Sequence, residues 1–295
     1  MSHEQTHAYQ YLLLSVSNPG NRISRYVNFI AEKPGSYESG FFYLIFFEMQ
    51  QEFEKYTRED LAVWSLLFER QVNNLKQKAC SDYLESLERM KDVLNPMELP
   101  NFERINHWFK KNTGWEIYCV PGLIGVEDFF DLLAEKKFPS STWLRSKEKL
   151  DYLEEPDMFH DIFGHIPLLC NAAYSEFVHA FGMLGKRFNY DSRILQELQR
   201  LYWFTIEFGL ISEENKLRIF GAGIISSFHE SISSISTREA IHPDFNLETI
   251  LQTDFCTSEI QQKYFVIEDI SQLKKAIETL NKLYSHELEH HSESI

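Results

Sequence analysis

The sequence has few cysteines, no long apolar run and no run of basic residues. Its four cysteines are widely scattered in 295 residues without a C-x-x-C pair, so we expect reduced thiols and no disulfide framework. The longest apolar run, Phe41–Phe47, is too short to span a bilayer. The first residues, MSHEQTHAYQ, lack the basic and apolar regions of a secretory signal. These features predict a cytoplasmic protein with no membrane partner.

Positive charge is in deficit, because 29 Lys and Arg stand against 44 Asp and Glu, which gives a net charge of −15. Binding to a polyphosphate is favoured by counterion release from basic contacts, so we expect no nucleic-acid partner. Neither a G-x-G-x-x-G string nor a Walker A string is present, so a nucleotide phosphate site is unsupported. Aromatic residues are abundant at 15%, including 24 Phe, which predicts bulky and rigid pockets.

Helical periodicity dominates the chain and predicts a mainly α fold, with one helical catalytic domain and a few short strands. Thr57–Asp60 has the spacing of a capping box, and one helix face follows it, traced by Leu61, Trp64, Phe68, Val72 and Leu75. Further helices are expected near 84–94, 101–112, 126–136, 157–170, 174–188, 193–211 (capped by Ser192) and 271–290, and strands near 115–120 and 216–220. We divide the chain into an N-terminal extension (1–40), a catalytic domain (41–270) and a C-terminal helix with a polar tail (271–295).

Two H-E-x-x-H strings, His3–His7 and His286–His290, match the pattern of zinc proteases. Both lie near the ends of the chain, where the backbone usually frays and water competes for a metal. We therefore expect solvent-exposed tails, with zinc hydrolysis as an alternative. Loss of metal binding after deletion of residues 1–8 or 285–295 would favour zinc hydrolysis, and retention of metal binding would favour exposed tails.

The segment PDMFHDIFGHIP (156–167) carries a histidine pair, His160 and His165. Residues five apart point about 140° away from each other on a regular α-helix, so joint use of both rings requires a distorted turn. Gly164 and Pro167 could supply that distortion. On spacing alone, structural histidines remain an alternative to metal ligands.

Glu207 lies in LYWFTIEFGL (201–210), a helix that is apolar on nearly every side. A buried carboxylate requires a cation, a proton or an arginine. Together with the two histidines it would form a two-His-one-carboxylate set, which suits non-haem Fe(II) and leaves one face of the metal open for oxygen and substrate. A salt bridge to a helix neighbour such as Arg200 remains the alternative.

Arg145 and Asp157 are twelve residues apart, and Asp157 directly precedes the histidine pair. An arginine held by a carboxylate near a metal could bind an amino-acid carboxylate through two hydrogen bonds. A surface arginine is the alternative.

Three strings together resemble the pterin-dependent aromatic amino acid hydroxylases, and among them the single-domain bacterial phenylalanine 4-hydroxylases. They are PDMFHDIFGHIPLL (156–169), LYWFTIEFGL (201–210) and FGAGIISSFHE (220–230), supported by VWSLLFERQ (63–71). The similarity covers about residues 50 to 268. It implies a mostly helical domain around a deep iron pocket. It also implies a monooxygenase that uses Fe(II), a tetrahydropterin and O2 to hydroxylate an aromatic amino acid. The expected reaction is the conversion of phenylalanine to tyrosine.

The resemblance assigns the site residues in three groups. The implied iron ligands are His160, His165 and Glu207. The implied amino-acid site consists of Arg145, buttressed by Asp157, and of Pro156, Trp203 and Ser226. The implied pterin site consists of Phe129, the backbone of Gly122, Leu123 and Ile124, and the nearby Asp161 and Tyr202.

Several alternatives remain open on the sequence. The segment 256–262 diverges from the family pattern, so the preferred ring could be tyrosine or tryptophan. A 2-oxoglutarate-type Fe(II) oxygenase would place its ligands in a different order on a β-barrel, and a helical scaffold without enzyme activity would hold no iron. The chain is expected to be a monomer or a small homo-oligomer.

Overall fold

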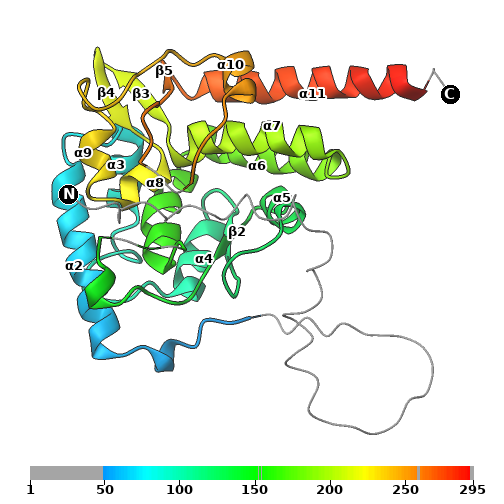
Figure 1. Ribbon diagram of the computed structural model, residues 1–295. Coiled ribbons are helices and arrows are strands. Elements are labelled where there is room, and N and C mark those ends of the chain that lie inside the picture. Colours follow the sequence, from blue (N-terminus) through cyan, green and yellow to red (C-terminus); the bar gives the residue numbers. More distant parts are fainter. Residues whose placement is uncertain (1–48, 152, 154, 258–259, 293–295) are drawn as a thin grey trace, which may run out of the picture.

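The computed structural model describes residues 49–151, 153, 155–257 and 260–292, and it is mainly helical with short strands, as predicted (Figure 1). The α-helices are α2 (Arg58–Leu75), α3 (Ser81–Arg89), α4 (Phe102–Lys110), α5 (Val126–Ala134), α6 (Ala172–Arg187), α7 (Ser192–Tyr202), α8 (Ala222–Ser226), α9 (Glu230–Ser233), α10 (Leu247–Gln252) and α11 (Ser271–Ser292). Shorter helical turns are η1 (Phe53–Lys55), η2 (Lys147–Lys149), η3 (His160–His165), η4 (Pro167–Cys170) and η5 (Trp203–Glu207).

The strands form two small sheets. In the first, β1 (Glu116–Cys119) pairs in parallel with β2 (Lys137–Ser140). In the second, β3 (Leu210–Glu213) lies between β4 (Lys216–Ile219), which is antiparallel to it, and β5 (Val266–Ile267), which is parallel.

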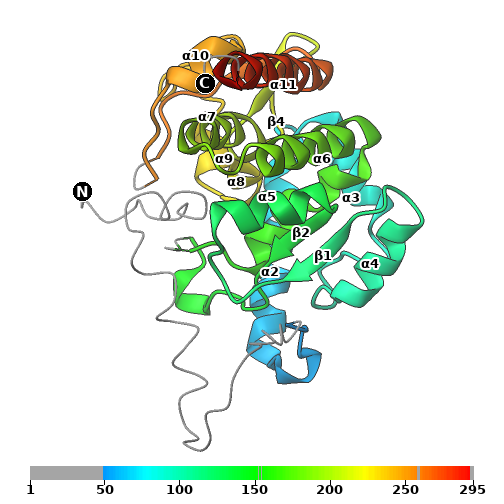
Figure 2. The same ribbon diagram turned by 90° about the vertical axis from the view of Figure 1, so that its right-hand side faces the viewer.

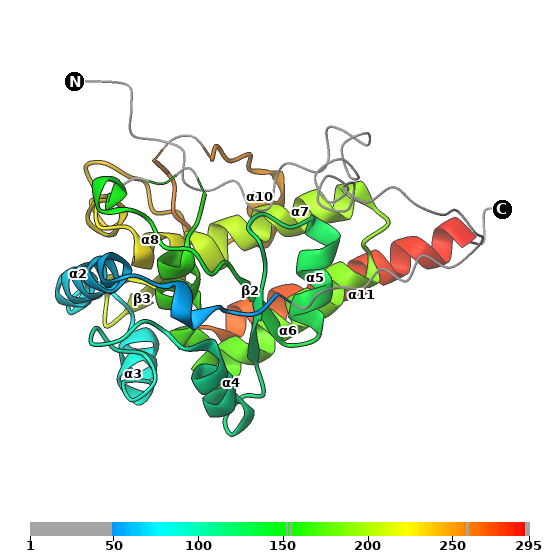
Figure 3. The same ribbon diagram turned by 90° about the horizontal axis from the view of Figure 1, so that it is seen from below.

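The helices are stacked in layers. Figure 1 shows α6 and α7 side by side with α11 above them, and Figure 2 shows α5 below α6 and the β1–β2 pair below α5. The view from below places α2 at the opposite end of the molecule from the projecting end of α11 (Figure 3). None of the helices in the described part of the chain is long and apolar enough to cross a membrane.

Helix α2 begins at the predicted capping box, in which Thr57 and Asp60 bond each other's backbone N–H groups. Its buried face is rotated from the predicted one. Leu61 and Val72 are only half-buried, whereas Val63, Leu67 and the polar Gln71 are buried. A polar side chain can occupy that position because its amide group is hydrogen-bonded, as described below.

Two predicted helices are wrong in detail. The expected helix 157–170 is a π-helical turn, η3, followed by the 3₁₀ turn η4. The expected helix 193–211 is capped by Asp191 instead of Ser192, and it passes into the π-helical turn η5 before β3 begins at Leu210. Leu210 belongs to a strand and not to the helix, because it pairs with Ile219 across the β3–β4 hairpin and with Val266, which is remote in sequence.

Candidate metal centre and its pocket

Two π-helical turns carry the three candidate metal ligands. His160 and His165 are the first and last residues of η3, and Glu207 is the last residue of η5. In a π-helical turn the hydrogen bond runs from residue i to residue i+5, so side chains five apart lie one above the other. The turn begins where the Asp157 carboxylate accepts a hydrogen bond from the His160 backbone N–H at 3.1 Å.

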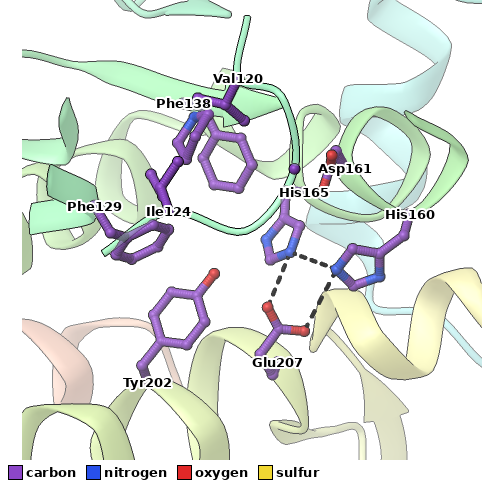
Figure 4. A pocket seen from close by; sticks show the side chains of 11 residues that line it. Val120, Ile124, Phe129, Phe138, His160, Asp161, His165, Tyr202 and Glu207 are labelled. Carbon is purple, nitrogen blue, oxygen red and sulfur yellow. Dashed lines mark hydrogen bonds and ion pairs between the residues drawn. The ribbon is translucent and has the colours of Figure 1, made fainter. Parts of the chain in front are cut away.

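The three side chains converge on one point (Figure 4). The Nε2 atoms of His160 and His165 are 3.2 Å apart, and Glu207 places Oε1 3.1 Å from His165 Nε2 and Oε2 3.8 Å from His160 Nε2. Among the described residues, these three side chains form the group of His, Cys, Asp or Glu residues whose ligand atoms are close enough to hold a metal ion. The alternative salt bridge to Arg200 is not formed among these residues, because the Arg200 guanidinium pairs with Asp254.

A divalent metal ion fits this site. Glu207 Oε2 is buried and has no hydrogen-bond partner, although it faces the two imidazoles. A buried carboxylate oxygen without a partner is costly, and a cation would remove that cost. Two nitrogens and one carboxylate that leave open positions are the donor set of non-haem Fe(II).

The protonation states also suit a metal. Burial lowers the pKa of His160 to about 4, so its imidazole is neutral. Burial alone would raise the pKa of Glu207, but His165 and His160 outweigh it and hold that pKa below its ordinary value. The centre therefore offers a neutral His160 nitrogen and an anionic Glu207 oxygen.

Ser226 fixes the orientation of His160. The Nδ1 atom of His160 lies 2.8 Å from Ser226 Oγ, and that hydroxyl donates to the carbonyl of Ala222 at 2.9 Å. Since the hydroxyl proton is used on Ala222, His160 Nδ1 is assigned as the donor to Ser226. The lone pair of Nε2 then points to the metal position, as in metal sites whose histidines donate their other N–H.

A pocket lies over the metal centre (Figure 4). It brings the three metal-site residues together with Gly122, Ile124, Phe129, Asp161 and Tyr202, all singled out from the sequence. Leu123 is not among the lining residues. Pro139 also lines the pocket, as do Val120 and Phe138, which were not assigned to the site. Their signal was weak, because they belong to two short strand segments that meet only in the fold.

Aromatic rings give the pocket its walls. The Phe138 ring lies 4.7 Å from the His165 ring, and the Phe129 ring meets Tyr202 edge-on at 5.3 Å. Gly122 has a φ of 151°, which side-chain-bearing residues rarely adopt, so glycine leaves its backbone bare at the pocket. Such a pocket can enclose a flat heterocycle.

Burial shifts the pKa of two polar groups of the pocket. It raises the pKa of Asp161 well above its usual value, although Asp161 Oδ2 accepts a hydrogen bond from the Ser141 backbone N–H at 2.9 Å. Burial and the nearby Glu207 raise the pKa of the Tyr202 phenol. The Tyr202 hydroxyl therefore keeps its proton and is a hydrogen-bond donor.

Arg145 and Asp157 form a buried two-point ion pair. Arg145 Nε and Nη2 donate to the two carboxylate oxygens of Asp157 at 2.8 and 2.7 Å. Burial would raise the pKa of Asp157, but Arg145 holds it below its ordinary value. The pair lies next to the metal centre, because the same carboxylate also receives the backbone N–H of His160.

The remaining predicted residues are not among those that line the pocket, but they adjoin the metal-site elements in the chain. Trp203 opens the turn that ends at Glu207, its indole N–H donates to Gln261 Oε1 at 3.1 Å, and its ring stacks on Phe255 at 4.6 Å. Pro156 is buried directly before Asp157. Of the H-E-x-x-H strings, His3–His7 lies outside the described residues, and His286 is exposed on α11.

Comparison with known proteins agrees with this geometry. The sequence pattern of the biopterin-dependent aromatic amino acid hydroxylases matches residues 48–295, which extends the expected similarity through α11. The phenylalanine-4-hydroxylase of Chromobacterium violaceum is 40% identical over 227 residues, which cover 77% of this chain and 75% of that enzyme.

Two solved structures of the Chromobacterium violaceum enzyme are similar in fold. The one with iron(III) and 7,8-dihydrobiopterin has a TM-score of 0.76 at 39% identity and covers 82% of this chain and 87% of its own. The one with iron and phenylalanine has a TM-score of 0.73 at 39% identity and covers 78% of this chain and 82% of its own.

Proposed function

The chain belongs to the family of biopterin-dependent aromatic amino acid hydroxylases, and we propose that its substrate is phenylalanine, converted to tyrosine. It is accordingly a monooxygenase that uses iron, a reduced pterin and O2. Phenylalanine is proposed because the Chromobacterium violaceum relative is a phenylalanine-4-hydroxylase and its structure has been solved with phenylalanine. The observation that carries the function is the buried His160–His165–Glu207 set, with its unpartnered oxygen, at the base of an aromatic pocket.

His160, His165 and Glu207 would hold the iron. When bound, Fe(II) would activate O2 and the tetrahydropterin would supply two electrons, so that one oxygen atom goes to the pterin and the other to the aromatic ring. The task of this chain is to bind both organic molecules, to orient them over the metal and to exclude water. The buried walls of the pocket support that task.

The pterin would lie between Phe129 and the bare backbone of Gly122, Leu123 and Ile124. The support for this placement is that Gly122, Ile124 and Phe129 line the pocket, and that Ile124 and Phe129 lie on the side away from His160 (Figure 4). The Tyr202 hydroxyl would donate to the heterocycle or to oxygen near the metal, and Asp161 would lie beside the heterocycle.

The amino-acid carboxylate would bind Arg145. A guanidinium fixed by a buried carboxylate presents its donors in a rigid plane, which suits a second carboxylate. Asp157 supplies that fixation, and Pro156 and Trp203 would contribute apolar walls. For Ser226, the contact with His160 supports an additional role, which is to orient the metal ligand.

We keep the proposed division of the chain, with the catalytic domain at 41–270 between the extension 1–40 and the C-terminal segment 271–295. Helix α11 packs on α6 and buries Leu273, Ile277, Leu280 and Tyr284, so it stabilises the body of the enzyme. A monomer or small homo-oligomer remains the prediction, which light scattering can test.

One experiment tests the proposed function. The purified protein, reconstituted with Fe(II), is given O2 and tetrahydrobiopterin with phenylalanine, tyrosine or tryptophan separately, and the products are identified by mass spectrometry. We expect tyrosine from phenylalanine and much slower reaction of the other two amino acids. Preferential turnover of tyrosine or tryptophan would overturn the substrate. Turnover that requires 2-oxoglutarate would overturn the pterin chemistry.

A further inference from the structure

Gln71 is a buried polar residue that the proposed mechanism does not use. It lies on the apolar face of α2 between Phe68 and Leu75, and its exposed fraction is 2%. A buried amide at such a position loses its hydration and must be hydrogen-bonded within the protein. Its partners therefore indicate what the side chain does.

The Gln71 amide binds the backbone on both sides of Ser226. Its Nε2 donates to the carbonyl of Ile225 at 2.6 Å and to that of Ser227 at 3.2 Å. These carbonyls lie at the C-terminal end of α8, which is only five residues long. The last carbonyls of a helix have no donor within it, so a donor from outside fixes the end of the helix.

The end of α8 matters because it carries the hydroxyl that orients His160. Ser226 Oγ lies 2.8 Å from His160 Nδ1, and η3 packs directly on α8. A Cβ atom at Gly164 of η3 would approach the Ala222 carbonyl to 2.9 Å, so little space separates the two elements. A displacement of Ser226 would therefore rotate or release the His160 ring.

Helix α2 is a rigid support for this contact. It is 18 residues long, has a complete capping box and buries Trp64, Leu67 and Phe68. One turn further along, Asn74 donates to Ser231 Oγ at 2.5 Å and to Gln71 Oε1 at 3.4 Å. The second contact orients the Gln71 amide so that its nitrogen faces α8.

We propose that Gln71 is a positioning residue for the iron ligand His160 and acts through Ser226. The proposal rests on the assignment of His160 to the iron site. It connects α2, which contributes no residue to the pocket lining, to the metal centre through Gln71, the 225–227 backbone, Ser226 and His160.

The test uses Gln71→Met, which keeps the length of the side chain and removes the amide. Asn106→Leu is the matched control, because the Asn106 amide also binds the backbone of another element, donating to the Ile117 carbonyl at 3.1 Å and accepting from its N–H at 2.6 Å. Co(II) is added to the metal-free proteins. Its dissociation constant and its visible ligand-field spectrum are measured, together with the Tm.

Gln71→Met is expected to weaken Co(II) binding by about tenfold, the order found for groups that orient metal-bound histidines, and to change the Co(II) spectrum. Asn106→Leu is expected to lower the Tm without either change. Asn74→Ala is a milder variant, which should fold even if Gln71→Met does not. It is expected to shift the Co(II) spectrum in the same direction as Gln71→Met but by a smaller amount. In a Ser226→Ala background, Gln71→Met should add little further loss of Co(II) affinity, because the path is already broken.

Wild-type Co(II) affinity and spectrum in Gln71→Met would overturn the proposal and leave Gln71 a stabilising residue only. If the loss of Co(II) affinity in Gln71→Met simply added to the loss in Ser226→Ala, the proposed path through Ser226 would be overturned. Failure of the iron site itself gives a different result, because wild type would then bind no stoichiometric Co(II), or Glu207→Gln would bind it as tightly as wild type.

Discussion

His160 and His165 are five residues apart in sequence, yet their Nε2 atoms approach each other to 3.2 Å. The π-helical turn η3 makes this possible, since it stacks residues five apart. Two nitrogen atoms this close, both facing the Glu207 carboxylate, form a site that is complete only with a cation. Replacement of any one of the three side chains should therefore abolish metal binding.

Glu207→Gln keeps the shape of the side chain and removes its charge. We expect it to weaken Fe(II) binding by more than about 100-fold, beyond the effect of losing an orienting group, and to reduce hydroxylation to background. His160→Ala and His165→Ala should behave alike. The measurement is the iron content after reconstitution and gel filtration, with Glu278→Gln on the exposed face of α11 as control. Full iron and full turnover in Glu207→Gln would mean that the carboxylate is structural.

Arg145→Lys replaces a planar guanidinium, which makes two parallel bonds to a carboxylate, with a single ammonium. Loss of such a charge-assisted pair costs about 2–3 kcal/mol, or roughly 30- to 150-fold in kcat/KM, and we expect it mainly as a raised KM for the amino acid. A misplaced ring should also uncouple the reaction, so that more pterin is oxidised per tyrosine formed. The measurement compares pterin consumed with tyrosine formed, and iron content is determined on the same sample.

An unchanged KM with tight coupling would show that Arg145 does not bind the substrate. A large loss of iron in Arg145→Lys would instead mean that the pair with Asp157 holds the fold around η3, since that carboxylate also binds the His160 backbone.

Phe129→Leu removes a ring from the wall where we place the pterin. Aromatic stacking contributes about 0.5–1.5 kcal/mol beyond buried area, so we expect the KM for the pterin to rise by roughly two- to tenfold. The KM for phenylalanine should change less. Phe130→Leu is the matched control, because Phe130 is on the same helix but is fully buried against Phe181. It should lower the Tm and leave the pterin KM unchanged; equal pterin KM values in the two variants would contradict the placement.

Glu230 should make the stability of the enzyme depend on pH. Burial raises its pKa from 4.5 to about 7, and the Tyr264 hydroxyl bonds its carboxyl group. Between these values the folded state keeps a proton that the unfolded state has lost, so stability falls as the pH rises and the loss is complete above pH 7. The raised pKa corresponds to about 3 kcal/mol.

Glu230→Gln cannot lose that proton. We expect its free energy of unfolding, measured with urea at pH 5 and pH 8, to fall by about 2–3 kcal/mol less than that of wild type over this range. The exposed Glu278→Gln should follow wild type. Parallel pH dependences of wild type and Glu230→Gln would contradict the raised pKa.

The sequence by itself determined the features that depend on neighbouring residues. The capping box at Thr57, the apolar faces of the helices and the strand at 116–119 follow from local spacing, and the structure contains each of them. The strings around 156–169 and 201–210 also determined the family, because several long matches in order are specific. Glu207 was informative from its sequence neighbours alone, since a carboxylate on an apolar helix requires a partner.

Only the tertiary structure decided what depends on residues far apart in the chain. Regular α-helical spacing points His160 and His165 in different directions, and the π-helical turn that aligns them is packed against α8, more than fifty residues away. The helix through Glu207 ends at β3 because Leu210 pairs with β5, more than fifty residues away, as well as with the neighbouring β4. Gln71 is buried because α8 supplies carbonyls to its amide. Local pattern reports the preference of a segment, whereas the partners that satisfy its polar groups become neighbours only when the chain has folded.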